Sequence, residues 1–315
     1  MRLWQKSMIA LAMSPRLTRI VQRSSFMRRL SARFVGGRDA VEVVRRARAL
    51  KDEGITSSLF FLGEYVDDPQ LIERSVVELI GVLPRVAEAA LEVHVSVDPT
   101  QVGSMIDWSL CQANVRRVAD AMAGLTTSAR RVLMLDMEDS GVTQRTLELR
   151  ERMCALGFPA AVTVQAYLRR SERDVRRLVE QGATVRLVKG ALAEPAEQAY
   201  TSRADIDRRY LALSELLLSA EAKAHGVYPA FGTHDERMID HARRVAVANG
   251  WAGHEWEIEM LLGVRPALQR KLVAEGCSVR LYVPFGERFW PYSVRRIGEN
   301  PRNLAFVLSA LRPSE

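Results

Sequence analysis

Cysteine is scarce in this chain of 315 residues, which contains only Cys111, Cys154 and Cys277. The three lie far apart in the sequence and form no C-x-x-C pair, so neither a disulfide framework nor a zinc site is predicted. The histidines also lack the spacing of known metal-binding motifs. We therefore expect reduced, mostly buried thiols in a cytoplasmic protein that binds no metal.

Long apolar runs are absent as well. No stretch of 18 apolar residues occurs in the chain, so no transmembrane helix is predicted. A hydrophobic fraction of 48% and a charged fraction of 26% are ordinary for a globular domain, and 315 residues suffice for one large domain with an appendage. The protein is expected to be soluble or peripheral on a membrane.

Acidic residues are missing from residues 1–38, which carry nine of the 45 Lys and Arg residues. The rest of the chain holds 36 basic and 38 acidic residues, so the net charge of +7 comes from this N-terminal segment. A body without excess positive charge disfavours nucleic acid as a partner.

Apolar residues recur at helical spacing among the arginines of this segment, which predicts a basic, helical N-terminal arm over residues 1–54. Two interpretations of the arm are open. Its helices pack on the rest of the protein, or they bind an anionic membrane, on its inner face, where a quinone is available.

Eight short runs with strand character follow the arm, separated by segments of helical periodicity that often end at glycine. Eight strand–helix alternations predict a parallel sheet closed on itself, an α/β fold of the (βα)8 TIM-barrel type over residues 55–315. No G-x-G-x-x-G follows any run, which disfavours an open, doubly wound sheet. The predicted strands are 57–63, 91–98, 131–138, 160–167, 183–190, 227–235, 256–261 and 278–286. The stretch 194–225 is longer than one connecting helix needs and predicts an additional helix.

Polar residues alternate with valine in the second run, where His94, Ser96 and Asp98 share one face. This alternation is unusual in a parallel strand covered on both sides, so the polar face is predicted to point into the barrel. Asp136 lies in the third run and Gln165 in the fourth, so several strands deliver polar groups to one rim. For each of them taken alone, a hydrogen-bonded core position is an equally good interpretation.

Arg186 and Lys189 are three residues apart in the fifth run. A regular strand brings both to one site only if it ends near Val188. From composition alone, structural ion pairing and a role in a site are equally good interpretations of the two cations.

Three short polar segments carry a resemblance to a known family. They read R-L-V-K-G at residues 186–190, F-G-T-H-D at 231–235 and V-R-R-I-G-E-N at 294–300. Each lies at the end of a predicted strand or in the helix just after one, where α/β barrels keep their chemistry. Together they resemble the proline dehydrogenase family, whose fifth strand reads R-L-V-K-G-A-Y and whose last helix reads V-R-R-x-x-E-N. The resemblance covers nearly the whole chain.

The resemblance implies noncovalently bound FAD, which this family lodges across the barrel mouth without a dinucleotide-binding domain. In the family the strand-five arginine lies beside the reactive flavin nitrogen, where a fixed guanidinium stabilises negative charge as hydride arrives. The strand-four glutamine bonds the flavin ring, and the Thr-His loop holds the phosphoribityl or adenosine part. The residues that this match assigns to the cofactor are Gln165, Arg186, Lys189, Gly190, Thr233 and His234.

The same resemblance assigns residues to the substrate. Arg295 and Arg296 would clamp a carboxylate, although adjacent arginines on a helix are also typical of a solvated, salt-bridged face. The first arginine would pair with Glu64 to form a lid over the substrate. Tyr282, at the end of the eighth strand, would pack near the proline ring.

Two positions depart from the family. Asp98 stands where the family has a lysine that helps to bind the carboxylate and pairs with the strand-three aspartate, here Asp136. Two carboxylates at close range would raise the pKa of one of them. Leu192 stands where the family usually has a tyrosine that lines the substrate site. The flavin positions are therefore matched, and the substrate positions only in part.

The function that the resemblance implies is oxidation of L-proline to pyrroline-5-carboxylate by an FAD-dependent enzyme that passes electrons to a quinone. The expected catalytic residues are Arg186, Asp136 and Tyr282, with Asp136 easing deprotonation of the substrate amine. Two alternatives stay open because both departures concern the substrate. One is a related enzyme that oxidises another cyclic or secondary amine, and the other is a catalytically silent barrel that binds flavin.

Overall fold

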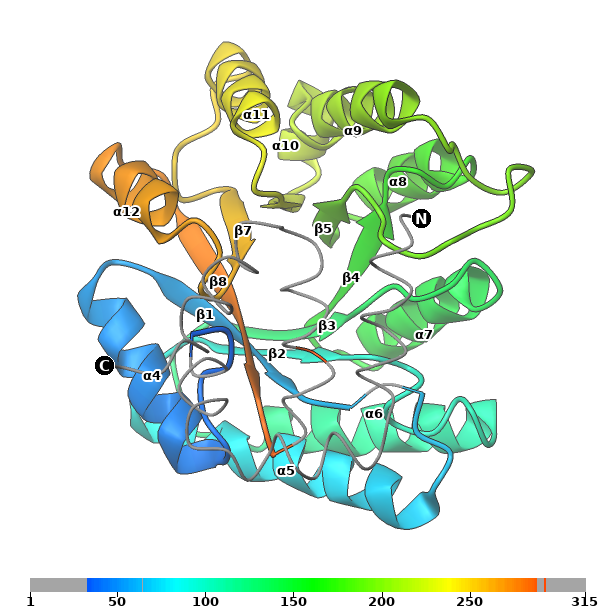
Figure 1. Ribbon diagram of the computed structural model, residues 1–315, viewed down its shortest axis with the longest axis vertical. Helices are drawn as coiled ribbons and strands as arrows, with labels where there is room; N and C mark the ends of the chain where they lie inside the picture. The colour runs from blue at the N-terminus through cyan, green and yellow to red at the C-terminus, as the bar shows by residue number, and fades with distance from the viewer. Residues whose placement is uncertain (1–32, 64, 288–291, 293–315) are drawn as a thin grey trace, which may run out of the picture.

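Eight parallel strands close into a barrel in the computed structural model, which describes residues 33–63, 65–287 and 292 (Figure 1). The strands pair in chain order, and β8 (Val279–Phe285) closes the barrel by pairing with β1 (Thr56–Phe61). The strands between them are β2 (Val93–Val97), β3 (Arg131–Leu135), β4 (Ala160–Gln165), β5 (Thr184–Val188), β6 (Tyr228–Gly232) and β7 (Glu257–Leu261). The predicted (βα)8 barrel is confirmed.

Helices surround the barrel and cover the outer face of the sheet (Figure 1). They are α4 (Ala40–Asp52), α5 (Pro69–Glu88), α6 (Trp108–Ala123), α7 (Thr143–Ala155), α8 (Ser171–Glu180), α9 (Arg203–Leu217), α10 (Ala220–Ala224), α11 (Glu236–Ala248) and α12 (Pro266–Ala274). Both α9 and α10 lie between β5 and β6, which confirms the additional helix predicted within residues 194–225.

Side chains alternate between the two faces of each strand. The valines of β2 belong to the apolar layer between the sheet and the helices, and all three are fully buried. Ser96 points the other way, because its hydroxyl reaches Ser58 of β1 and Arg186 of β5 across the barrel. The polar face of β2 therefore lies inside the barrel, as predicted.

Helix α4 lies within the segment predicted as an N-terminal arm. It begins after Asp39, whose side chain accepts a hydrogen bond from the backbone of Glu42. Its buried face packs against α5 and β1. This part of the arm is thus packed on the barrel, and the membrane-binding interpretation concerns residues 1–32, which lie outside the described residues. Within the described part of the chain, no helix is long and apolar enough to cross a membrane.

Candidate active site

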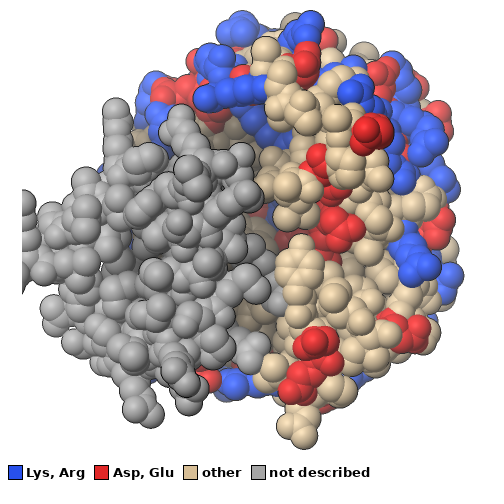
Figure 2. Space-filling view, turned by 45° about the vertical axis from the view of Figure 1, so that its right-hand side comes forward, with Lys and Arg blue, Asp and Glu red and all other residues tan. Residues whose placement is uncertain are grey.

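A cavity of about 380 Å³ opens at the C-terminal ends of the strands. Every strand, or the loop directly after it, contributes to the cavity wall, and barrels of this kind place their chemistry there. Figure 2 shows acidic side chains beside the hollow at the centre of one face, with Lys and Arg toward its periphery. All predicted site residues that the structure describes line the cavity, namely Asp98, Asp136, Gln165, Arg186, Lys189, Gly190, Leu192, Thr233, His234 and Tyr282.

Three predicted substrate residues, Glu64, Arg295 and Arg296, lie outside the described residues, and their assignment stays a prediction. Tyr292, which the structure describes, is buried and lines the cavity. Tyr292 precedes Arg295 by three residues in the sequence.

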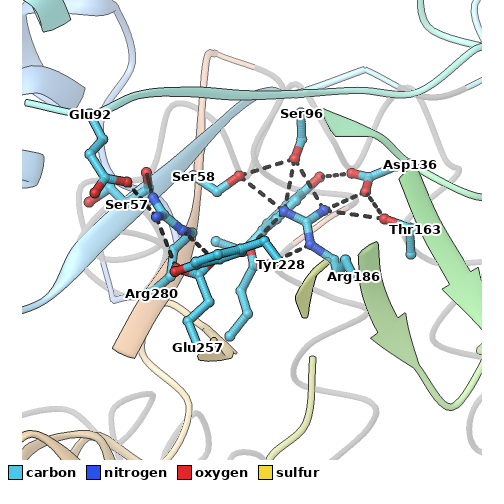
Figure 3. A network of polar contacts seen from close by, with 12 residues as sticks. Ser57, Ser58, Glu92, Ser96, Asp136, Thr163, Arg186, Tyr228, Glu257 and Arg280 are labelled. Atoms are coloured by element: carbon cyan, nitrogen blue, oxygen red, sulfur yellow. Dashed lines mark hydrogen bonds and ion pairs between the residues drawn. The ribbon is translucent and has the colours of Figure 1, made fainter. Parts of the chain in front are cut away.

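Arg186 lies at the floor of the cavity and is almost fully buried. Figure 3 shows the polar contacts of its side chain. Its Nη1 donates to Asp136 Oδ1 at 2.5 Å, and its Nε and Nη2 donate to the two carboxylate oxygens of Glu259 at 2.6 Å each. Burial alone would lower the pKa of the guanidinium, but the two carboxylates raise it above its ordinary value. Arg186 is therefore a fixed cation.

The other donors of Arg186 are also used. Nη2 lies 3.1 Å from Ser58 Oγ, and each Nη lies 3.2 Å from Ser96 Oγ. Nη1 is also 3.5 Å from Thr163 Oγ1. Each N–H of the guanidinium thus has a protein acceptor, so its plane is held by strands on several sides of the barrel.

Tyr282 and Asp136 form a second link in the same network. The Tyr282 hydroxyl donates to Asp136 Oδ2 at 3.0 Å, and the Thr163 hydroxyl donates to Asp136 Oδ1 at 2.7 Å. Burial, followed by the charges of Asp136 and Asp98, raises the pKa of Tyr282 well above its ordinary value. Tyr282 therefore keeps its proton at neutral pH and remains a donor.

Glu259 was missed by the sequence analysis, although it binds Arg186 through both carboxylate oxygens. A signal for it exists in the sequence. Glu257 and Glu259 alternate with apolar residues in β7, as the polar residues of β2 do, and so share the inner face of the barrel. That alternation in a buried parallel strand places both glutamates inside the barrel, and Glu259, which is nearer the C-terminal end of the strand, is the one that lines the cavity.

Lys189 follows β5 directly, and because the strand ends at Val188 both Lys189 and Arg186 face the site, as predicted. Its Nζ lies 2.5 Å from Asp207 Oδ1 and 3.1 Å from Asp235 Oδ2. Hydrogen bonds from Arg237, then from Lys189, hold the pKa of Asp235 far below its ordinary value. The lysine is thus fixed at the rim by two ionised carboxylates.

A wide, open groove adjoins the cavity. Lys189, Thr233 and His234 line both the cavity and the groove. Its wall also carries three arginines, namely Arg203, Arg237 and Arg265, so that four cations stand against the two aspartates Asp207 and Asp235 that pair with Lys189 and Arg237. Guanidinium and ammonium groups are the usual protein partners of phosphate oxygens. The groove therefore suits the phosphate part of a dinucleotide whose ring lies in the cavity.

Gln165 lines the cavity and carries an unused acceptor. Its Nε2 donates to the carbonyl oxygen of Met137 at 3.2 Å, but its buried Oε1 has no hydrogen-bond partner among the described residues. A buried acceptor without a donor costs about 1–3 kcal/mol. An N–H of a bound ring would remove that cost, so Gln165 fits the flavin role assigned to it by the resemblance.

Gly190 is packed where only glycine fits. Its φ is +106°, and a Cβ atom there would overlap the ring of Tyr167. Backbone strain of this kind costs about 1–3 kcal/mol. Gly190→Ala is expected to lower the free energy of unfolding by more than this, because the clash with Tyr167 adds to the strain. Gly157→Ala is the matched control, with φ of +84° and no atom within 4 Å of the added Cβ. Equal losses for the two variants in thermal denaturation would show that Tyr167 moves aside.

Both departures from the family line the cavity. Asp98 follows β2 directly, is only 8% exposed and lies close enough to Tyr282 to help raise its pKa. Leu192 lies in the loop after β5. The described wall carries four acidic residues, Asp98, Asp136, Glu138 and Glu259, against the two basic residues Arg186 and Lys189.

The fold and the cavity together define an α/β-barrel protein whose site lies at the C-terminal face of the barrel. Residues 43–309 match the family model described as proline dehydrogenase. The chain is 34% identical over 318 residues to the proline dehydrogenase of Deinococcus radiodurans, covering 98% of each chain. It is 31% identical over 283 residues to proline dehydrogenase 2 of Bacillus subtilis, covering 89% of this chain and 90% of that one. The chain belongs to the proline dehydrogenase family, and the resemblance seen in its motifs is confirmed.

The fold is also found in a larger solved structure. Proline utilization A from Bdellovibrio bacteriovorus, inactivated by N-propargylglycine, matches with a TM-score of 0.78 and 24% identity. The match covers 87% of this chain and 33% of that longer chain. At this identity the likeness concerns the barrel itself.

Proposed function

We propose that the protein oxidises L-proline to pyrroline-5-carboxylate with FAD as cofactor and a quinone as electron acceptor. Membership of the family supports the reaction class. The observation that carries the proposal is the fixed cation of Arg186 beneath a cavity to which every barrel strand contributes. Such a cation stabilises negative charge that develops above it in a site shielded from water.

The cofactor is assigned to residues that fit its parts. Gln165 would accept a hydrogen bond from the flavin ring, and Gly190 permits the close packing of the loop that follows β5. Lys189, Thr233 and His234 lead from the cavity into the groove and would hold the phosphate part. When bound, FAD would accept the hydride that leaves the ring carbon beside the substrate nitrogen.

The protein's own share of the reaction is to orient the substrate and take up its amine proton. The amine must be neutral when the hydride leaves, and Asp136 is the carboxylate at the cavity wall placed to accept its proton. Tyr282 and Arg186 hold Asp136 from two sides and fix its direction. Arg295 and Arg296 are assigned to the substrate carboxylate, with Glu64 as the partner that closes over it.

Anaerobic titration with a panel of secondary amines tests this function. Purified protein should be yellow, should release FAD on acid precipitation and should bleach on addition of proline. Yellow protein that bleaches with another cyclic or secondary amine and not with proline would point to a related oxidase. Yellow protein that bleaches with none would point to a silent flavin-binding barrel, and protein that takes up no FAD on reconstitution would overturn the cofactor assignment.

Deleting residues 1–32 tests the membrane-binding interpretation of the arm. The deletion removes seven basic residues and keeps Arg33, whose Nε donates to the Gly263 carbonyl at 3.3 Å. Because each basic residue contributes about 1 kcal/mol to binding at an anionic surface, affinity for vesicles with anionic lipid should fall steeply. Turnover with a soluble dye should persist. A variant with the seven basic residues replaced by Gln is the matched control, because it keeps the arm and removes its charge. Unchanged vesicle binding in both variants would rule out the membrane-binding interpretation and leave packing on the barrel.

A further inference from the structure

Two Glu–Arg pairs lie inside the barrel, an upper pair at the level of Glu259 in β7 and a lower pair at the level of Glu257, two residues nearer the N-terminal end of the strand. Figure 3 labels Arg186, Glu257 and Arg280 of these pairs. In the upper pair, Glu259 holds Arg186 by two bonds of 2.6 Å. In the lower pair, Glu257 holds Arg280 of β8 by bonds of 2.7 and 3.0 Å. The two glutamates are neighbours on the inner face of β7, and each is only 3% exposed. The chain therefore presents the same buried contact at two depths.

Only the upper pair reaches the cavity. Arg186 and Glu259 belong to its wall, whereas Glu257 and Arg280 do not. The lower pair is instead completed by Glu92, 2.6 Å from Arg280 Nη2, and by the carbonyl oxygen of Ser57. It lies toward the N-terminal end of the barrel, which in this fold serves stability.

The upper and lower groups have the same formal charge, because each arginine is shared between two carboxylates, but only the upper group adjoins the cavity. Arg186 is shared between two carboxylates, so the group formed with Asp136 and Glu259 has a formal charge of −1 when both are ionised. Burial raises the pKa of Glu259, and the contact with Arg186 opposes that rise. Without Glu259 the same group would be neutral. In a buried site, one charge next to a ligand changes the stability of the ligand's charged form strongly, because water does not screen it.

Glu259 also controls geometry. It engages Nε and Nη2 side by side, in the bidentate arrangement that fixes the plane of a guanidinium. With that edge held, Nη1 points to Asp136. No other described residue holds Arg186 by two bonds from one carboxylate.

We propose that Glu259 is a positioning residue that orients Arg186 toward the cavity and, through its negative charge, lowers the reduction potential of the flavin bound there. The inference rests on the proposed function, because it requires flavin in the cavity. The negative charge of Glu259 then partly offsets the positive charge of Arg186. A flavin bound in this site would give up its electrons more readily than a flavin beside an arginine without such a partner.

The test compares Glu259→Gln with Glu257→Gln, which remove the same charge from the same strand at the two depths. The two-electron midpoint potential of the flavin is measured in each holoenzyme with a redox dye. Glu259→Gln should shift the equilibrium about tenfold toward reduced flavin, a rise of about 30 mV for a two-electron couple. Glu257→Gln should leave the potential at the wild-type value. Glu259→Asp, which keeps the charge, should also stay near wild type.

A second measurement reports on the orientation of Arg186 without any flavin. The Nε–H proton of Arg186 should exchange slowly with solvent in wild-type apoprotein and in Glu257→Gln, and much faster in Glu259→Gln. Equal potentials in all variants, or equal shifts for the two Gln variants, would overturn the electrostatic role of Glu259. Unchanged exchange would overturn its positioning role. Wild-type protein that binds no FAD would instead refute the proposed function, and the exchange rates would still decide the positioning.

Discussion

Arg186→Met is expected to lower kcat/KM for proline by about 100-fold to 1000-fold and the free energy of unfolding by about 3–5 kcal/mol. The loss of activity follows from removing the cation of Arg186 from the floor of the cavity. The loss of stability follows because Asp136 and Glu259, both largely buried, are left without a counterion. Steady-state kinetics and denaturant titration measure the two effects separately.

Two further variants separate catalysis from stability. Arg186→Lys keeps the charge but cannot reproduce the bidentate contact with Glu259, so it should recover part of the stability and little of the activity. Arg280→Met breaks the lower pair with Glu257, and it should cost similar stability without a comparable fall in kcat per bound flavin. If Arg186→Met retained wild-type kcat/KM in its folded fraction, the catalytic assignment of Arg186 would be wrong.

The barrel could be predicted from the sequence because each strand is a short apolar run between helices of regular periodicity. The ends of the strands were less accurate. The sixth run was predicted to extend to residue 235, whereas β6 ends at Gly232. The residues after it, from Thr233 to Asp235, leave the sheet to serve the site and to cap α11. The Thr233 N–H still donates to the carbonyl oxygen of Glu259 at 3.1 Å, so the error falls where polar side chains continue a strand pattern past the last residue of the strand.

The site could be predicted wherever a motif or the end of a strand marked it, as at Arg186 and Lys189. The ion pairs of these two residues could not be predicted from the sequence. Glu259 lies two strands away from Arg186 in the barrel, and Asp207 lies in α9, so these contacts depend on register and closure of the whole sheet. Local spacing carries no information about such distances. The structural and functional interpretations of these two cations turn out to be compatible, because each is ion-paired and also lines the cavity.

The acidic wall of the cavity makes Asp98 the most informative position for the substrate. It lies directly after β2, near Tyr282, and among the described residues of the wall the acidic ones outnumber the basic ones. If proline is the substrate, a carboxylate here opposes the substrate's own carboxylate. Asp98→Lys should then lower KM for proline about tenfold or more, since reversing a buried charge at short range exceeds 1.4 kcal/mol.

The opposite outcome has an equally clear physical reason. If the enzyme acts on a secondary amine with a second positive charge or a blocked carboxylate, Asp98 recognises that substrate, and Asp98→Lys should abolish its turnover without improving proline oxidation. Leu192→Tyr separates the two cases further, because restoring the family's tyrosine should strengthen the effect of Asp98→Lys only when proline is the substrate. Asp98→Asn is the control that removes the charge and keeps the size. We expect the proline case, because Tyr282, Arg295 and Arg296 are all retained, and a wild-type preference of tenfold or more for another amine would refute it.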